Sequence, residues 1–341
     1  MIITIRSHLS SNTGYGILTE QIGMALEQLG HDVRLDDYSV IDCFGPISKW
    51  SESHRVKEGA GVVLQITMPN HVCPRGIPTA YFTMWESTRL LEPNFSLPYL
   101  NDVSAVVVPC RWNAENFAAE GVTTPIHVVP LGLTGCYRAA PMTMNGPTRF
   151  GFAARVAHGP PRKRVREAVE AFTAAFPKGD EDVRLYLKIE PGWTTEIGPV
   201  DDDRICLMTK ILTERELFAW YQRMTVLFHP SSGEGWGLHV HEAMACGRPV
   251  IACRYSGTAE FFNSSCGWEI AYDEVPATGI MYEGLGNWAM PRHDSMVDAL
   301  REAHVDRMEC ARRGVAGAAR AREFTWERSA RTLLPVLESI A

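Results

Sequence analysis

Short apolar runs alternate with amphipathic stretches along most of the chain. Residues 1–5 (MIITI) predict a buried strand, and residues 16–30 repeat apolar positions at helical spacing before stopping at Gly30. A short helix is predicted at 111–121. Further apolar runs bounded by turn residues predict strands at 31–35, 61–66, 79–85, 103–109 and 126–130. This alternation is typical of a parallel sheet that helices cover on both faces.

A second alternation follows an irregular stretch, residues 131–148, that is rich in Gly and Pro. Its strands are predicted at 149–154, 183–189, 204–208, 225–230 and 249–253. Its helices are predicted at 165–176, 214–224 and 237–247, and at most positions from residue 294 onward. The pattern predicts an α/β fold with two Rossmann-like halves, and we place the boundary between them at residues 140 and 141.

Composition and charge change this picture little. The 341 residues suffice for two domains, and 45% hydrophobic and 21% charged residues are ordinary for a globular protein. The formal net charge of -7 disfavours a strongly electrostatic nucleic-acid binder. One cationic run, residues 155–166, can be a local basic patch or, equally, a solvated loop and helix start.

The cysteines and the apolar run lengths bear on the compartment. Nine cysteines fit no zinc or disulfide template, which favours a reducing environment. The N-terminus has no signal-peptide pattern, and no apolar run approaches the roughly 18 residues of a membrane span. We therefore expect a cytoplasmic protein, and peripheral contact with the inner membrane face stays open.

Ligands of open parallel sheets bind where strands end and helices begin, and two loops stand out by this rule. The first is residues 7–16 (SHLSSNTGYG), after the first strand. Its Gly14 and Gly16 would let backbone amides approach a ligand in front of the next helix. The G-x-G is shorter than a dinucleotide fingerprint, and a simple tight turn is an equal alternative.

The second loop, SSGEGWG, leads from the strand ending at Pro230 into a helix, and three glycines expose its backbone: Gly233, Gly235 and Gly237. A helix N-terminus here would suit a phosphate. Glu234 suits a neutral polyol better, because a carboxylate repels a diphosphate and accepts hydroxyls well. Glu242, about one turn into the helix, can reach a further diol such as a ribose. In the alternative, Glu234 caps the helix and Glu242 is a solvated surface charge.

Residues 229–261 (HPSSGEGWGLHVHEAMACGRPVIACRYSGTAEF) resemble the E-x7-E segment of retaining glycosyltransferases of family 4, which have the GT-B fold. Four further stretches resemble the same family: 106–133, 151–172, 211–232 and 323–340. The resemblance implies two Rossmann-like domains facing each other across a cleft. The first, 1–140, would bind the acceptor and the second, 141–322, the nucleotide sugar. A closing helix, 323–341, would cross back to the first.

The resemblance also implies roles for single residues. Glu234 would hold donor-sugar hydroxyls, and Glu242 would accept from the ribose hydroxyls. Arg155 and Lys163 would stabilise the departing nucleotide diphosphate, as two fixed cations can where other enzymes use a metal. The backbone amides that would face the sugar and diphosphate are those of Gly235, Trp236, Gly237 and Leu238. No metal and no cofactor are expected.

Three further positions complete the implied site or depart from the family pattern. Ile211, which opens one matching stretch, is assigned to the donor side. Glu86, in YFTMWESTRLLEP (81–93), would face the cleft on the acceptor side, and the alternative is a charge at a helix N-terminus. His239 stands where the family commonly has proline. His239 and His241 are two residues apart and do not share a helix face, so packing is favoured over zinc binding.

The implied activity is transfer of a sugar from a nucleotide-diphosphate sugar to an acceptor hydroxyl, with retention of the anomeric configuration. The acceptor stays open among a glycan, a lipid-linked or small molecule and, against the acidic balance, a modified nucleic-acid base. A non-catalytic protein of the same fold that binds nucleotide sugars or glycans is the alternative from another class. The intact pairs Glu234/Glu242 and Arg155/Lys163 argue against it. Nothing resembles the pyridoxal lysine motif of a sugar phosphorylase.

Overall fold

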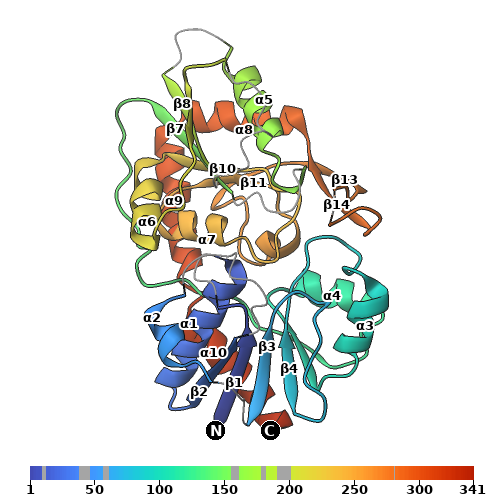
Figure 1. The fold of residues 1–341 in the computed structure, drawn as a ribbon. Helices are drawn as coiled ribbons and strands as arrows, with labels where there is room; N and C mark the ends of the chain where they lie inside the picture. The colour runs from blue at the N-terminus through green and yellow to red at the C-terminus, as the bar shows by residue number, and fades with distance from the viewer. Residues whose placement is uncertain are drawn as a thin grey trace. The chain divides into compact units, whose positions relative to one another are not determined.

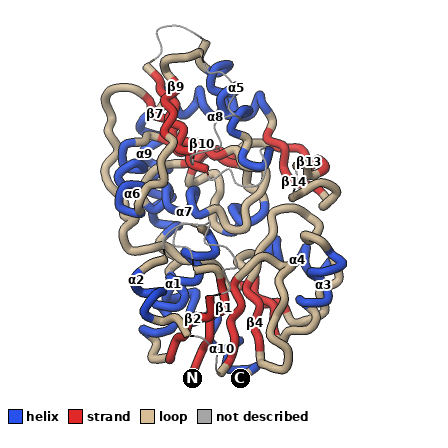
Figure 2. The backbone as a smooth tube through the Cα atoms, in the orientation of Figure 1, coloured by secondary structure: helices blue, strands red, loops and turns tan. Residues whose placement is uncertain are grey.

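The computed structural model describes residues 1–9, 13–37, 47–56, 61–154, 161–177, 182–189, 201–279 and 281–341. These residues form two compact units. The first unit consists of Met1–Trp85, Arg89–Thr134 and Phe324–Ala341. The second consists of Glu86–Thr88 and Gly135–Glu323. Each unit is built around one six-stranded sheet (Figures 1 and 2), which confirms the predicted pair of α/β halves.

The first sheet has the strand order β2-β1-β3-β4-β5-β6, and all its pairs are parallel. Its strands are β1 (Ile2–Ser7), β2 (Asp32–Asp37), β3 (Val62–Ile66), β4 (Thr79–Phe82), β5 (Ala105–Val108) and β6 (Ile126–Val128). The helices of this unit are α1 (Gly14–Gln28), α2 (Lys49–Ser53), α3 (Pro93–Leu100), α4 (Arg111–Ala119) and α10 (Trp326–Ile340). Strands β3, β4 and β5 are buried along their whole length, as expected for continuous apolar runs inside a parallel sheet.

Helix α10, at the end of the chain, belongs to the first unit, as the family resemblance implied. Its buried residues repeat at helical spacing, and its Ser329 Oγ donates to the Pro130 carbonyl at 2.5 Å. Leu133 forms a β-bridge with Thr325 immediately before the helix begins. Gly132 makes this approach possible, because a Cβ there would lie 2.1 Å from the Trp326 nitrogen.

The second sheet has the strand order β12-β11-β10-β7-β8-β9, again with parallel pairs throughout. Its strands are β7 (Thr148–Ala154), β8 (Val183–Ile189), β9 (Ile205–Met208), β10 (Val226–His229), β11 (Val250–Ala252) and β12 (Gly267–Glu269). The helices of this unit are α5 (Val165–Ala175), α6 (Glu214–Arg223), α7 (Leu238–Ala245), α8 (His293–Val305) and α9 (Arg307–Ala321), with 3-10 turns η1 (Pro161–Lys163) and η3 (Ser256–Glu260).

The strand order places a switch point between β7 and β10. From β7 the chain passes through α5 to β8 on one side, and from β10 it passes through α7 to β11 on the other. Right-handed crossovers therefore put α5 and α7 on opposite faces of the sheet. A switch point of this kind is where open α/β sheets bind ligands.

A two-stranded antiparallel sheet, β13 (Tyr272–Pro276) and β14 (Asn287–Pro291), extends the second unit. We call β13, β14 and the described residues between them the arm. The sequence pattern did not predict it. Among the residues that the structure describes, no helix has both the length and the apolar character that a membrane span requires.

Candidate functional site

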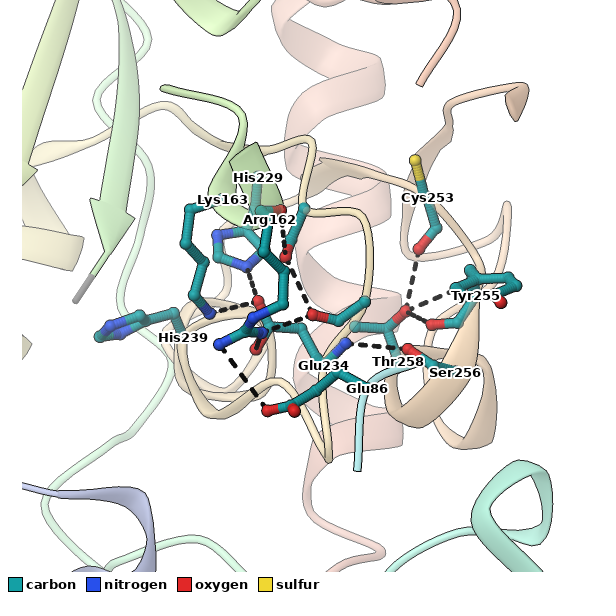
Figure 3. Close-up of polar contacts among 12 residues, drawn as sticks. Glu86, Arg162, Lys163, His229, Glu234, His239, Cys253, Tyr255, Ser256 and Thr258 are labelled. Atoms are coloured by element: carbon teal, nitrogen blue, oxygen red, sulfur yellow. Dashed lines mark hydrogen bonds and ion pairs between the residues drawn. The ribbon is translucent and has the colours of Figure 1, made fainter. Parts of the chain in front are cut away.

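Glu234 lies on the loop between β10 and α7, and its side chain meets three nitrogen donors (Figure 3). Its Oε1 accepts from Lys163 Nζ at 2.5 Å and from His229 Nε2 at 2.9 Å. Its Oε2 accepts from Arg162 Nη1 at 3.4 Å. The residue is only 8% exposed, so these donors replace much of the water that the carboxylate has lost. The structure thus brings Lys163 to Glu234 across the switch point.

The two cations of this cluster keep the Glu234 carboxylate ionised. Burial by itself would raise the pKa of Glu234, but Lys163 and Arg162 outweigh it and hold that pKa well below its ordinary value. Burial lowers the pKa of His229, so this ring is neutral and donates through Nε2. Burial and then Arg162 also lower the pKa of Lys163, while Glu234 acts in the opposite direction. The result is a buried carboxylate that stays ionised.

The backbone of the Glu234 loop is fixed from two sides. On one side, Arg162 donates from Nη1 to the Gly233 carbonyl at 2.6 Å, and its own carbonyl accepts from Ser232 N at 2.8 Å. On the other, Glu234 N donates to Ser256 Oγ at 2.9 Å, as Figure 3 shows. A carboxylate on so restrained a backbone can present a defined geometry to a ligand.

Glu86 begins a short segment, Glu86–Thr88, that belongs to the second unit although the chain on both sides of it belongs to the first. Its Oε2 accepts from Tyr282 Oη at 3.0 Å, and its Oε1 lies 3.7 Å from Arg162 Nη2. Arg162 therefore stands between the carboxylates of Glu86 and Glu234 (Figure 3). The alternative of a helix N-terminal charge is wrong, because the next helix begins only at Pro93.

Glu242 forms a second polar network on α7. It is 6% exposed, and its Oε2 accepts from Tyr221 Oη at 2.8 Å. His239 Nδ1 lies 2.8 Å from the same Tyr221 oxygen and 3.4 Å from Glu242 Oε2. Burial therefore contradicts the alternative that Glu242 is a solvated surface charge. The His239 ring also lies 6.4 Å from that of His229, so the two networks adjoin.

Helix α7 begins at the glycine loop. Gly237, its N-cap, has φ = 99°, a left-handed conformation that favours glycine. The Trp236 side chain is buried, and its Nε1 donates to His241 Nδ1 at 3.1 Å. His241 Nε2 in turn donates to the Ala321 carbonyl at 3.2 Å. His241 thus serves packing, as the sequence favoured, and the described residues contain no cluster of three or more side chains suited to a metal ion.

The remaining predicted site residues lie elsewhere or outside the described residues. Gly14 and Gly16 belong to the first turn of α1 in the first unit, where Thr13 Oγ1 accepts from Gly16 N at 2.9 Å. Gly14 and Gly16 thus begin a helix, and residues 10–12 of the preceding loop lie outside the described residues. Ile211, between β9 and α6, is 48% exposed. Arg155 lies outside the residues that the structure describes.

Sequence reasoning missed four residues of these networks: Arg162, His229, Tyr221 and Tyr282. Arg162 and His229 had a usable signal, because one adjoins Lys163 and the other ends the strand that leads to Glu234. Tyr221 and Tyr282 had none, since only the tertiary fold brings them to Glu242 and Glu86.

Comparisons with known proteins agree with this architecture. Among solved structures, sucrose-phosphate synthase of Thermosynechococcus elongatus superposes with a TM-score of 0.72 at 16% identity, covering 99% of this chain and 98% of that one. HepE of Anabaena, solved in complex with UDP and glucose, superposes with a TM-score of 0.68 at 14% identity, covering 99% and 100%. With its two parallel six-stranded sheets, this chain has the GT-B fold.

The sequence comparisons concern the second unit most directly. Residues 147–278, which include the Glu234 loop and α7, match the family model Glycosyl transferases group 1. A stretch of 160 residues is 28% identical to D-inositol 3-phosphate glycosyltransferase of Pseudarthrobacter chlorophenolicus, covering 44% of this chain and 33% of that protein. Another of 138 residues is 30% identical to MMP alpha-(1->4)-mannosyltransferase of Mycolicibacterium hassiacum, covering 40% and 33%. The matches thus span about a third of these relatives' length.

Proposed function

We propose that this chain transfers a sugar from a nucleotide-diphosphate sugar to an acceptor hydroxyl, with retention of the anomeric configuration. One observation carries the proposal. A buried, ionised Glu234 contacts Lys163 and Arg162 at the switch point of a sheet whose sequence matches a glycosyltransferase family. Such a site offers a carboxylate for sugar hydroxyls and cations for a departing phosphate.

The lone pairs of Glu234 indicate how the donor sugar binds. Two carboxylate oxygens accept about four hydrogen bonds. Oε1 already accepts from Lys163 and His229, whereas Oε2 has, among the described residues, a single long contact to Arg162. We therefore assign Oε2 to the donor-sugar hydroxyls. Glu242, oriented by Tyr221, would accept from the ribose hydroxyls in the same way.

The departing diphosphate would be held by Lys163, by Arg155 and by the backbone amides from Gly235 to Leu238, with no metal ion. In the transfer, the bond from the anomeric carbon to the phosphate oxygen breaks. The acceptor oxygen forms its bond on the same face, and its proton passes to a phosphate oxygen. Protein groups contribute orientation and charge stabilisation in this scheme.

The acceptor is a sugar, a lipid-linked glycan or a small polyol in this proposal. The names of the inositol phosphate glycosyltransferase and the mannosyltransferase support a polyol or sugar. The sequence placed Glu86 on the acceptor side, but we assign it to the donor sugar instead, because Arg162 links it to Glu234. The backbone amide of Gly14, at the start of α1, is assigned to the same reaction, whereas that of Gly16 already donates to Thr13 Oγ1.

A donor screen tests the proposal directly. Thermal unfolding is measured with UDP-, GDP-, ADP- and TDP-sugars, and one of them should raise the midpoint because it binds only the folded chain. With that donor and a panel of sugars and polyols, proton NMR of the product should show the donor's anomeric configuration. A chain that no nucleotide sugar stabilises would contradict the proposal, and an inverted product would contradict retention.

A further inference from the structure

The arm contacts the Glu234 loop directly. Ala289 N, on β14, donates to the Ser232 carbonyl at 3.0 Å. The neighbouring ring of Trp288 is buried under the guanidinium of Arg164, whose carbon lies 5.2 Å from the ring centroid. Arg164 Nε also donates to Ser232 Oγ at 2.6 Å. The arm is thus part of the support of this loop.

The arm also holds the segment that carries Glu86. Thr88 N donates to the Asn287 carbonyl at 3.0 Å, and Asn287 N donates to Thr88 Oγ1 at 2.7 Å. These two bonds fix the backbone next to Glu86. The carbonyl of Glu86 approaches the Glu234 loop so closely that a Cβ on Gly233 would lie 2.4 Å from it. One element therefore supports both carboxylate-bearing segments.

Tyr282 brings the arm into the polar cluster itself. Its side chain is buried, and its Oη donates to Glu86 Oε2 at 3.0 Å. Burial raises the pKa of Tyr282 well above its ordinary value, so the phenol keeps its proton and donates at any working pH. The Arg162 guanidinium lies over the same ring, 5.9 Å from its centroid. Tyr282 therefore contacts both partners of the Glu86–Arg162 ion pair.

We propose that Tyr282 is a positioning residue of the donor-sugar site. Its hydroxyl orients Glu86, Glu86 anchors one end of the Arg162 guanidinium, and the other end fixes the carbonyl of Gly233 and the carboxylate of Glu234. The proposal rests on the proposed function, because it concerns the oxygen of Glu234 that is assigned to the sugar.

The chemistry predicts a selective effect. Without the phenol hydroxyl, Glu86 loses its only neutral donor among the described residues and turns to the guanidinium at 3.7 Å. Arg162 is then drawn away from Gly233 and Glu234, and Oε2 of Glu234 no longer has a fixed direction. Binding of the sugar should weaken, whereas binding of the nucleotide diphosphate, which uses other groups, should not.

Calorimetric titration of four variants tests this inference. The ligands are the nucleotide sugar that stabilises the wild type and the corresponding nucleotide diphosphate without sugar. Tyr282→Phe should raise the Kd of the nucleotide sugar about 10-fold and leave the Kd of the diphosphate within about twofold. Glu86→Gln should act in the same direction, and the double variant should be no weaker than the weaker single variant, because both act through Arg162. The control is Tyr272→Phe on β13, which should bind both ligands as the wild type does.

The outcomes are distinct. A wild type that binds no nucleotide sugar would refute the proposed function itself. A Tyr282→Phe variant with unchanged affinities would refute only the positioning role. Equal weakening of both ligands, with a lower unfolding midpoint, would show that Tyr282 only supports the fold. Effects of Tyr282→Phe and Glu86→Gln that multiply in the double variant would show that Tyr282 does not act through Glu86.

Discussion

At the scale of single residues, the environment of Glu234 explains how a buried carboxylate can stay ionised. Burying an ion costs several kcal/mol unless partners compensate it. Lys163 and Arg162 do so from the turn η1, and His229 does so from the end of β10. Two of these partners are cations and the third is a neutral donor. Removing one cation leaves a buried charge with weakened compensation, so the effect of a substitution here should be large.

Replacing Lys163 by Ala, or Glu234 by Ala, should each reduce turnover by about 10²-fold or more, because each removes a charge that the proposed transfer uses. Initial rates with the identified donor measure this. Lys210→Ala is the matched control, since Lys210 forms an ion pair with Glu216 that is exposed to solvent, and its rate should stay within about twofold. Wild-type turnover in both active-site variants would contradict the site assignment.

Tyr221 offers a second test at this scale, since its hydroxyl orients Glu242. Tyr221→Phe keeps the packed ring and removes one hydrogen bond to a carboxylate, so the Kd of the nucleotide diphosphate should rise about 10-fold. The change is measured by calorimetric titration. Tyr186→Phe on β8 is the control and should not change the Kd. An unchanged Kd in Tyr221→Phe would separate Glu242 from ribose binding.

There is a physical reason why some of these residues could be predicted from the sequence and others could not. Glu234 follows a strand at the switch point, and strand ends can be read from apolar runs. Lys163 was found only through the family resemblance. Glu242 was suggested by its place in the helix, and its ribose role rested mainly on that resemblance. Tyr282 contacts Glu86 across a large separation in sequence, and no local pattern encodes such a pair.

At the scale of elements, two buried hydrogen bonds hold the start of α7 in place. Trp236 donates to His241, and His241 donates to the carbonyl of Ala321 at the end of α9. Because an indole nitrogen only donates, His241 Nδ1 must accept and Nε2 must carry the hydrogen. The ring is therefore held in its neutral form. Burial lowers the pKa of His241 to about 3.

This lowered pKa makes stability depend on pH. The unfolded chain takes up a proton at His241 near pH 6.5, whereas the folded chain does not until about pH 3. The stabilisation is thus complete above pH 6.5 and is lost as the pH falls, by about 2 kcal/mol at pH 5. Urea unfolding at pH 8 and pH 5 should show a loss of stability that is smaller by that amount in His241→Phe than in the wild type. Equal losses in the two proteins would contradict the neutral, buried ring.

The packing of α10 in the first unit leads to a prediction that concerns only the stability of the fold. Gly132→Ala places a Cβ 2.1 Å from the backbone nitrogen of Trp326, and no side chain can rotate away to relieve this contact. Unfolding should cost about 3 kcal/mol less than in the wild type. Gly135→Ala is the control, because nothing lies within 4 Å of its Cβ, and its effect should be within about 0.5 kcal/mol. A stable Gly132→Ala variant would show that the helix does not dock as described.

All strands of the two sheets except β12 were predicted, whereas the arm was not. Strands such as β3, β4 and β10 are mostly apolar and are buried at every position, because both faces of a parallel sheet are covered. Strand β13 is mostly exposed and mixes polar and apolar residues without a clear period of two. Its pairing with β14 depends on docking against the rest of the second unit, which a local pattern does not reveal.

At the scale of the whole molecule, two repeats of the same alternation predicted two Rossmann-like α/β halves, and the family resemblance implied the GT-B fold. The alternation did not predict that residues 86–88 belong to the second unit. Their place there affects the charge balance of the Glu234 cluster. The chain carries a net charge of -7, yet in the cluster two cations, Arg162 and Lys163, balance two carboxylates, Glu86 and Glu234.

A site with fixed cations leads to a prediction about metal ions. Removal of divalent metals should leave the transfer rate within about twofold, because Lys163 and the amides at the start of α7 would meet the charge that develops on the diphosphate. Rates are measured after dialysis against EDTA, with and without added Mg²⁺ or Mn²⁺, and a metal-dependent phosphatase in the same buffer verifies the chelation. Lys163→Ala sharpens the test. If the lysine replaces a metal, added Mg²⁺ should partly restore this variant while leaving the wild type unchanged. Loss of wild-type activity in EDTA that Mg²⁺ restores would contradict the metal-independent proposal.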